Sequence, residues 1–269
     1  MSIYYKVIGE GYPVVMLHGW SLDHHIMLHM LEPLFENRIG IGWKRIYIDL
    51  PGMGQSASSP SIQNSDQMLE AVLNLLDQII PNEPFIVCGY SYGGYMARGI
   101  IHARPNQVHG AFLLAPMVVP TFNERILPGH SVLRRDKNLL ARLSPEEATE
   151  FGSMGVSQGE HEWERFQHDV LIPAKKADEA FLTHIQENGY GFSFDISTTL
   201  HYPALIITGR QDHIVGYQDT WQLIEEYPRA TFTVLDIAGH NLQYEQINVI
   251  NALVHEWLNR LEEEVTLTK

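Results

Sequence analysis

Two hydrophobic patterns alternate along the first part of the chain. Short apolar runs, as over residues 85–88, are typical of buried strands, whereas apolar residues recur every three or four positions over 66–80, which is helical spacing. In chain order these patterns predict strands over 3–8 and 14–17, a helix over 22–34, a strand over 45–48, a helix over 66–80, a strand over 85–88, a helix over 92–103 and a strand over 108–114. The alternation predicts an α/β protein with a mostly parallel central sheet flanked by helices.

The pattern changes after residue 116, and no apolar run between 117 and 202 predicts a core strand. A helix is expected after Ser144, because serine caps helix N-termini and the following Pro145 suits a first turn. The remaining expected elements are helices over 160–171 and 176–188, a strand over 204–208, a helix over 217–227, a strand over 231–235 and a helix over 244–261. We therefore expect an α/β core of residues 1–116 and 203–269, with residues 117–202 inserted as a helical cap.

Composition narrows the classes of protein that this chain can represent. The formal net charge of −14 argues against a nucleic-acid partner and against binding to an anionic membrane surface. The single cysteine, Cys88, excludes an intrachain disulfide and fits a reducing compartment. The first residues lack the charged, apolar and cleavage regions of a signal peptide, and no apolar run reaches the length of a membrane span. We expect a cytoplasmic protein with a small-molecule partner, of undetermined oligomeric state.

The candidate chemistry begins at Gly89-Tyr90-Ser91-Tyr92-Gly93, between a predicted strand and a predicted helix. This is the setting of a nucleophile elbow, in which a tight turn exposes a serine hydroxyl at the end of a sheet. Glycine is needed at 89 and 93 because the backbone passes too close for a Cβ atom. The alternative is an ordinary glycine–serine loop, so the assignment of Ser91 as a nucleophile depends on the rest of the chain.

A serine nucleophile needs a base, and the base needs an orienting acid. Asp212 follows the predicted strand 204–208, and His240 follows the next strand. Loops that leave parallel strands at their carboxyl ends share one edge of the sheet, so the three side chains can converge. Taken singly, Asp212 could be an ordinary aspartate in a turn, and His240 could be a histidine that caps a helix. Asp236 is a weaker candidate for the acid, because it lies only four residues before His240.

An acyl-transfer site also needs donors for the oxyanion that forms on the substrate. One candidate is the backbone N–H of Tyr92, directly after the nucleophile. The second is the backbone N–H of Trp20, in the loop after strand 14–17. We expect His18, in the same loop, to have a structural role beneath it.

Together these motifs resemble the α/β-hydrolase superfamily, in its esterase-like branch. The resemblance covers residues 3–116 and 203–262 and includes His18-Gly19-Trp20 and the loop 49–56. It implies a serine hydrolase that acts through an acyl-enzyme on Ser91 without a cofactor. Relatives with an aspartate nucleophile, such as haloalkane dehalogenases and epoxide hydrolases, are excluded because position 91 is serine.

The resemblance leaves the substrate open. We expect a small carboxylic ester or related acyl compound; a carbon–carbon bond hydrolase, a lactonase and an amidase or aminopeptidase-like enzyme are the alternatives, with a non-catalytic receptor as a remote one. No metal site is expected, although His25 and His29 lie four positions apart. Five residues near the predicted loops are the candidates for an apolar pocket wall, which would suit an uncharged substrate: Trp20, Tyr92, Met117, Ile214 and Val215.

Overall fold

The computed structural model describes residues 2–36, 38 and 40–267. Its centre is a seven-stranded sheet in the order β1-β3-β2-β4-β5-β8-β9. The first edge pair, β1 and β3, is antiparallel, and every other neighbouring pair is parallel. The strands are β1 (Tyr5–Ile8), β2 (Tyr12–Leu17), β3 (Trp43–Ile48), β4 (Phe85–Tyr90), β5 (Val108–Leu114), β8 (Ala204–Gly209) and β9 (Ala230–Leu235). The predicted mostly parallel sheet is confirmed.

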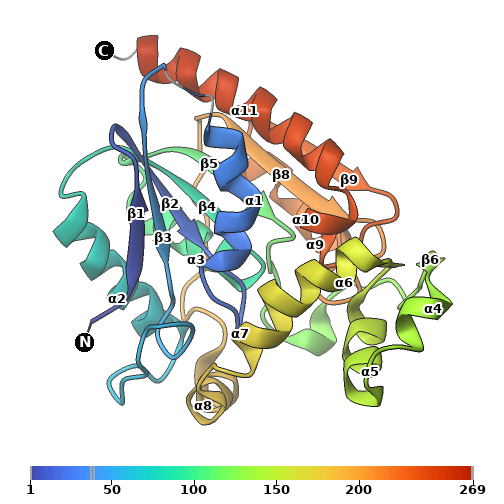
Figure 1. Cartoon of the computed structure of the whole chain (residues 1–269). Helices are drawn as coiled ribbons and strands as arrows, with labels where there is room; N and C mark the ends of the chain where they lie inside the picture. Colours follow the sequence, from blue (N-terminus) through green and yellow to red (C-terminus); the bar gives the residue numbers. More distant parts are fainter. Residues whose placement is uncertain (1, 37, 39, 268–269) are drawn as a thin grey trace.

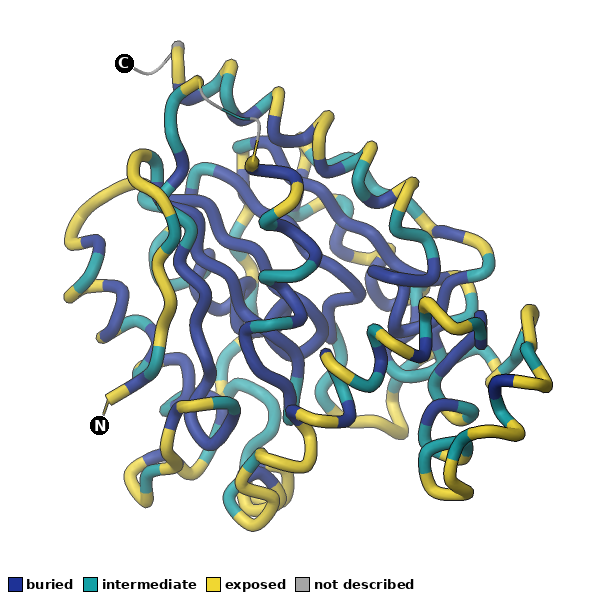
Figure 2. The backbone as a smooth tube through the Cα atoms, viewed as in Figure 1, coloured by how far each residue is buried: buried dark blue, intermediate teal, exposed yellow. Residues whose placement is uncertain are grey.

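Helices cover both faces of this sheet (Figure 1). α1 (His25–Phe35) and α11 (Ile247–Leu267) lie together on one face, while α2 (Ser65–Ile79) and α3 (Tyr92–Ala103) lie together on the other. The central strand β4 is buried along its whole length, because it has a strand on each side and a helix layer above and below. Figure 2 shows this burial concentrated in the sheet, with exposed backbone on the outer turns of the helices.

Residues 117–202, which we call the middle segment, contribute no strand to the central sheet within their described length. The segment contains η1 (Phe122–Glu124), β6 (Arg134–Arg135), α4 (Lys137–Leu140), α5 (Pro145–Met154), β7 (Ser157–Gln158), α6 (Glu160–Phe166), η2 (Gln167–Leu171), α7 (Ile172–Ala174) and α8 (Glu179–Gly189). α5 begins as predicted, with a capping box between Ser144 and Glu147. The parallel pair β6–β7 was not predicted, because two-residue strands leave no hydrophobic pattern.

Three predicted helices are divided or change their form, and others begin up to three residues later than predicted, as α1 and α8 do. The expected helix 217–227 is divided into α9 (Gln218–Trp221) and the 3₁₀ segment η3 (Gln222–Glu226). The expected helix 160–171 changes from α6 to the π-helical η2. The final helix begins as a separate turn, α10 (Leu242–Glu245), and Gln246 interrupts it with φ −132° and ψ 38°. No described helix has the length and apolar character needed to cross a membrane.

Candidate active site

Ser91 stands at the turn between β4 and α3, in a backbone conformation that serine rarely adopts. Its φ is 55° and its ψ is −117°, so it lies in the half of conformational space that glycine favours. The turn is tight on both sides. A Cβ atom on Gly89 would collide with the carbonyl oxygen of Gly93, and one on Gly93 would collide with that of Leu17. The close packing that the sequence predicted at both glycines is present.

Ser91, His240 and Asp212 form a continuous hydrogen-bonded chain. His240 Nε2 lies 2.9 Å from Ser91 Oγ, and His240 Nδ1 lies 2.9 Å from Asp212 Oδ2. Asp212 follows β8 and His240 follows β9, so the carboxyl ends of three parallel strands bring the side chains together. Ser91 is 9% exposed, His240 6% and Asp212 0%, so the chain runs from the cavity wall into the interior.

The surroundings of Asp212 favour its ionised form. Burial acts to raise the pKa of this carboxyl, but His240 and the backbone N–H groups of Val215 and Ile214 outweigh burial and lower it. Asp212 Oδ1 accepts these hydrogen bonds from Ile214 at 2.9 Å and from Val215 at 3.1 Å. An ionised Asp212 accepts the Nδ1 proton of His240 and leaves Nε2 as the acceptor that faces Ser91.

The weaker candidate for the acid, Asp236, lies on the surface. Its Oδ1 accepts a hydrogen bond from Gln211 Nε2 at 2.8 Å, and the contact lowers the pKa of Asp236. The side chain that reaches the His240 ring is therefore that of Asp212, which lies in the loop after β8, while Asp236 directly follows β9 and is exposed to solvent.

The loop after β2 is supported from below by two buried residues. Leu50 N donates to His18 Nε2 at 2.9 Å, so the ring carries its proton on Nδ1 and donates it to Gly19 O at 2.7 Å. Burial lowers the pKa of His18, which fits this neutral ring. Asp49 accepts hydrogen bonds from Gln55 N at 2.8 Å and from His24 N at 2.7 Å. These contacts give the Gly19–Trp20 turn a fixed position beside Ser91.

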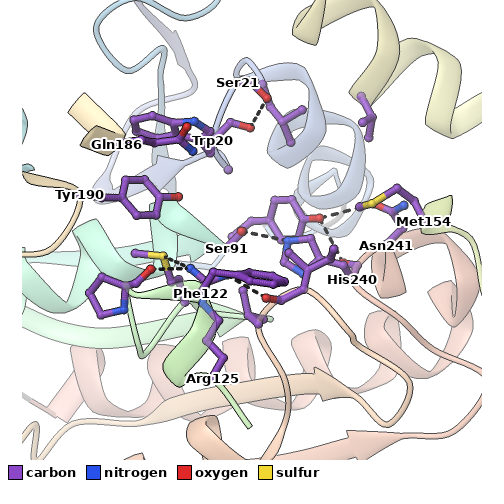
Figure 3. A pocket seen from close by; sticks show the side chains of 18 of the residues that line it. Trp20, Ser21, Ser91, Phe122, Arg125, Met154, Gln186, Tyr190, His240 and Asn241 are labelled. Atoms are coloured by element: carbon purple, nitrogen blue, oxygen red, sulfur yellow. Dashed lines mark hydrogen bonds between the residues drawn. The ribbon is translucent and has the colours of Figure 1, made fainter. Parts of the chain in front are cut away.

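A cavity of about 680 Å³ opens in front of Ser91. In Figure 3 the Ser91 and His240 side chains point toward each other, with Trp20 and Tyr190 across the cavity from them. Four of the five residues proposed from the sequence line it, namely Trp20, Met117, Ile214 and Val215.

The prediction for the fifth proposed wall residue is wrong, because Tyr92 does not line the cavity. Its side chain is fully buried, and its hydroxyl lies 2.7 Å from Ser65 Oγ. The Tyr92 ring stacks on Tyr190 at a centroid distance of 5.2 Å and meets the Trp20 ring edge-on at 4.6 Å. Tyr92 therefore supports the wall from behind, because helix α3 turns its side chain away from the cavity.

The middle segment supplies a large part of the cavity wall, and sequence reasoning missed these residues. They are Pro120, Thr121, Phe122, Arg125, Met154, Val170, Gln186, Tyr190 and Gly191. Arg125 is the charged member, and its guanidinium donates to Val119 O and Ile214 O at 2.8 Å each and to Pro120 O at 2.9 Å. It thereby ties the middle segment to the loop that carries Asp212, a role for which no sequence signal existed.

Three neighbouring residues, which are not among those that line the cavity, offer possible metal ligands. Asp23, His24 and His25 each present one ligand atom, and these atoms lie within 4.8 Å of one another. Two ring nitrogens in this group are already used, since His24 Nδ1 bonds Asp49 at 2.9 Å and His25 Nδ1 bonds Asp23 at 3.0 Å. His29, the other histidine considered from the sequence, bonds Asp169 through Nδ1 at 2.7 Å. These contacts account for the histidines as structural hydrogen-bonding groups.

Comparison with known proteins adds to this geometry. The sequence profile of the alpha/beta hydrolase fold matches residues 12–246. An alpha/beta superfamily hydrolase from Oenococcus oeni PSU-1 has a similar structure, with a TM-score of 0.86 and 32% identity over 97% of this chain and 99% of that chain. A pimeloyl-[acyl-carrier protein] methyl ester esterase from Aeromonas hydrophila is 26% identical over 249 residues, covering 89% of this chain and 92% of that protein. A thermophilic esterase from Thermogutta terrifontis shares the fold, with a TM-score of 0.69 and 22% identity over 97% of this chain and 94% of that chain.

The chain belongs to the α/β-hydrolase family. It is an enzyme of that family, and its relatives include esterases.

Proposed function

We propose that the protein is a serine esterase in which Ser91 is the nucleophile, His240 the general base and Asp212 the orienting acid. The observation that carries the proposal is the hydrogen-bonded chain from Asp212 Oδ2 through His240 to Ser91 Oγ, with 2.9 Å at each step. A serine hydroxyl is a weak nucleophile by itself, and this chain supplies both the proton acceptor and the group that fixes its tautomer.

The reaction proceeds in two halves. Ser91 Oγ attacks the ester carbonyl carbon while its proton passes to His240 Nε2, and the tetrahedral intermediate collapses as His240 returns that proton to the departing alcohol. Water then attacks the acyl-enzyme and gives its proton to His240, after which the carboxylic acid leaves and Ser91 regains its proton. Asp212 remains ionised throughout and stabilises the imidazolium.

Two backbone N–H groups are assigned to the oxyanion. Tyr92 is the first residue of α3, so its N–H has no partner one turn earlier in the helix. Trp20 follows Gly19 in the loop held by His18 and Asp49. A donor of this kind typically contributes about 3 kcal/mol to lowering the barrier.

The residues that line the cavity, many of them from the middle segment, indicate which class of substrate the site can bind. We assign residues 117–202 as a cap over the core of residues 1–116 and 203–269, since this segment provides wall residues such as Met154 and Tyr190. Aromatic and aliphatic side chains dominate the wall, which suits an uncharged acyl or alcohol group. Esterases among the relatives support a carboxylic ester as the substrate class.

A fluorophosphonate probe and a panel of nitrophenyl esters test this function together. The probe is expected to phosphonylate Ser91 Oγ alone, with loss of fluoride and of the serine proton, and ester turnover is expected to show an optimum in acyl chain length set by the cavity of about 680 Å³. Ser21 provides a matched control, because it lines the same cavity while its hydroxyl donates to Trp20 O at 2.7 Å. Labelling of Ser21, or no turnover of any ester by a folded protein, would contradict the proposal.

A further inference from the structure

Glu245, in the short helix α10, is a buried acid outside the Ser91–His240–Asp212 chain. It is 6% exposed, and its carboxylate accepts three hydrogen bonds from backbone N–H groups, one from the nearby Gly239 and two from the middle segment. Oε2 accepts from Gly239 at 2.6 Å, and Oε1 accepts from Val156 at 2.7 Å and from Ser157 at 3.2 Å. One carboxylate thus joins the residue before His240 to the middle segment.

On the middle-segment side, Glu245 holds the start of the small β6–β7 sheet. Val156 O accepts hydrogen bonds from Leu133 N at 2.9 Å and from Arg134 N at 3.1 Å, so the peptide that Glu245 binds also anchors β6. Val156 and Ser157 are both buried. If Glu245 moved, residues 133–134 and 156–157 would therefore be expected to move together, because they are hydrogen-bonded to one another.

On the other side, Glu245 fixes the backbone that carries His240. Gly239 is confined as well as bonded, because a Cβ atom placed on it would lie 2.7 Å from Val156 Cγ2. After His240, Tyr90 Oη donates to the His240 carbonyl oxygen at 3.1 Å. The peptides on both sides of His240 are thus held, and Glu245 is the charged group that holds the first of them.

The contacts of Glu245 favour an ionised carboxylate, while its burial opposes ionisation. All three partners donate hydrogen bonds, and in the described part of the chain no lysine, arginine or histidine pairs with Glu245. The pKa of Glu245 is raised to about 7: burial has the largest effect, the negative Asp212 also raises the pKa, and the three N–H groups act to lower it. The other titratable groups near Glu245 are the buried hydroxyls of Tyr90 and Tyr244, and Glu162, which binds the Ser157 hydroxyl.

We propose that Glu245 is a positioning residue that couples the seating of residues 133–158 to the placement of the His240 ring. The proposal rests on the function proposed above for Ser91 and His240. An ionised Glu245 accepts hydrogen bonds from all three N–H groups. Protonation turns one of its oxygens into a hydroxyl that acts as a donor, so the side chain loses part of its capacity to accept these three hydrogen bonds. Because a misplacement of about 1 Å can cost roughly 100-fold in rate, loosening the Gly239 peptide should affect turnover although Glu245 touches no reacting atom.

The test replaces the carboxylate with an amide of the same shape. In Glu245→Gln the amide nitrogen must face an N–H donor, so kcat is expected to fall about 10-fold to 100-fold with little change in KM. Glu162→Gln is the matched control: its carboxylate accepts from Ser157 Oγ at 2.9 Å but has no contact with Gly239, and its kcat should equal that of the wild type.

The pH profile separates positioning from a merely structural role. In the wild type, log kcat is expected to fall more steeply with decreasing pH than in Glu245→Gln, because Glu245, whose pKa is about 7, gains a proton over this range. In Glu245→Gln, the slope of log kcat against pH should be that of a single protonation. An unchanged kcat and an unchanged slope in a folded, active Glu245→Gln protein would overturn the proposal.

Hydrogen exchange in the wild type gives a second measurement that does not depend on a variant folding. Protection of the Gly239 and Val156 amides, corrected for intrinsic exchange, is expected to fall together as pH decreases from 8 to 6. Protection that is independent of pH would overturn the coupling. Failure of the proposed function has a different signature, since the wild type itself would then neither turn over esters nor take the probe on Ser91.

Discussion

Replacement of Ser91 with alanine is expected to lower kcat for ester hydrolysis by about 10,000-fold or more. Alanine removes the oxygen that lies 2.9 Å from His240 Nε2, so no acyl-enzyme can form. The residual rate would come from binding and from the backbone donors alone. The loss is measured from initial rates at saturating ester, with enzyme concentration fixed by absorbance because an inactive variant cannot be titrated by the probe.

Ser21→Ala serves as the control for the loss of a hydroxyl from the same cavity. Its kcat should remain within a few-fold of the wild type, because the Ser21 hydroxyl is bonded to Trp20 O and is not near His240 Nε2. If Ser91→Ala retained most of the ester turnover and Ser21→Ala lost it, the nucleophile would have been assigned to the wrong residue.

The second large effect is expected for Asp212→Asn, with kcat lowered about 10,000-fold. Asp212 Oδ1 already accepts from Ile214 N and Val215 N, so the asparagine oxygen would occupy that position and its amide nitrogen would face His240 Nδ1. An N–H at that point requires Nδ1 to act as an acceptor. The imidazole proton would then sit on Nε2 and face Ser91, where a base is needed.

Asp236→Asn is the matched control for Asp212→Asn. Its carboxylate is exposed and binds Gln211, so its removal should leave kcat near that of the wild type. A variant pair with the opposite outcome, in which Asp236→Asn loses turnover and Asp212→Asn keeps it, would show that the acid had been misassigned. Thermal melting of both variants verifies that the measured rates come from folded protein.

The sequence predicted the Ser91, His240 and Asp212 contacts because strand ends carry the information. Each residue comes after an apolar run, and parallel strands bring the loops at their carboxyl ends to one edge of the sheet. The side-chain direction of Tyr92 was predicted wrongly, because a position next to the nucleophile determines where the N–H points but not where the ring goes. Its ring packs on Tyr190, a residue of the middle segment that has no sequence motif.

The wall residues that the middle segment contributes could not be predicted either, because they are not marked by any sequence motif. Its wall residues are selected by tertiary contacts, as when Arg125 binds the carbonyl oxygens of Val119 and Ile214. Glu245 is a similar case, since its three partners are main-chain groups that every residue except proline possesses. A hydrophobic pattern reports burial of side chains and contains no record of such backbone donors.

The backbone of Ser91 has a consequence for engineering. At φ 55° and ψ −117° a non-glycine residue costs on the order of 1–3 kcal/mol, whereas glycine adopts such angles without steric penalty. A library of variants ranked by heat resistance alone would therefore enrich glycine at position 91 and discard the nucleophile. Directed evolution of this scaffold toward harsher conditions has to select for turnover in every round.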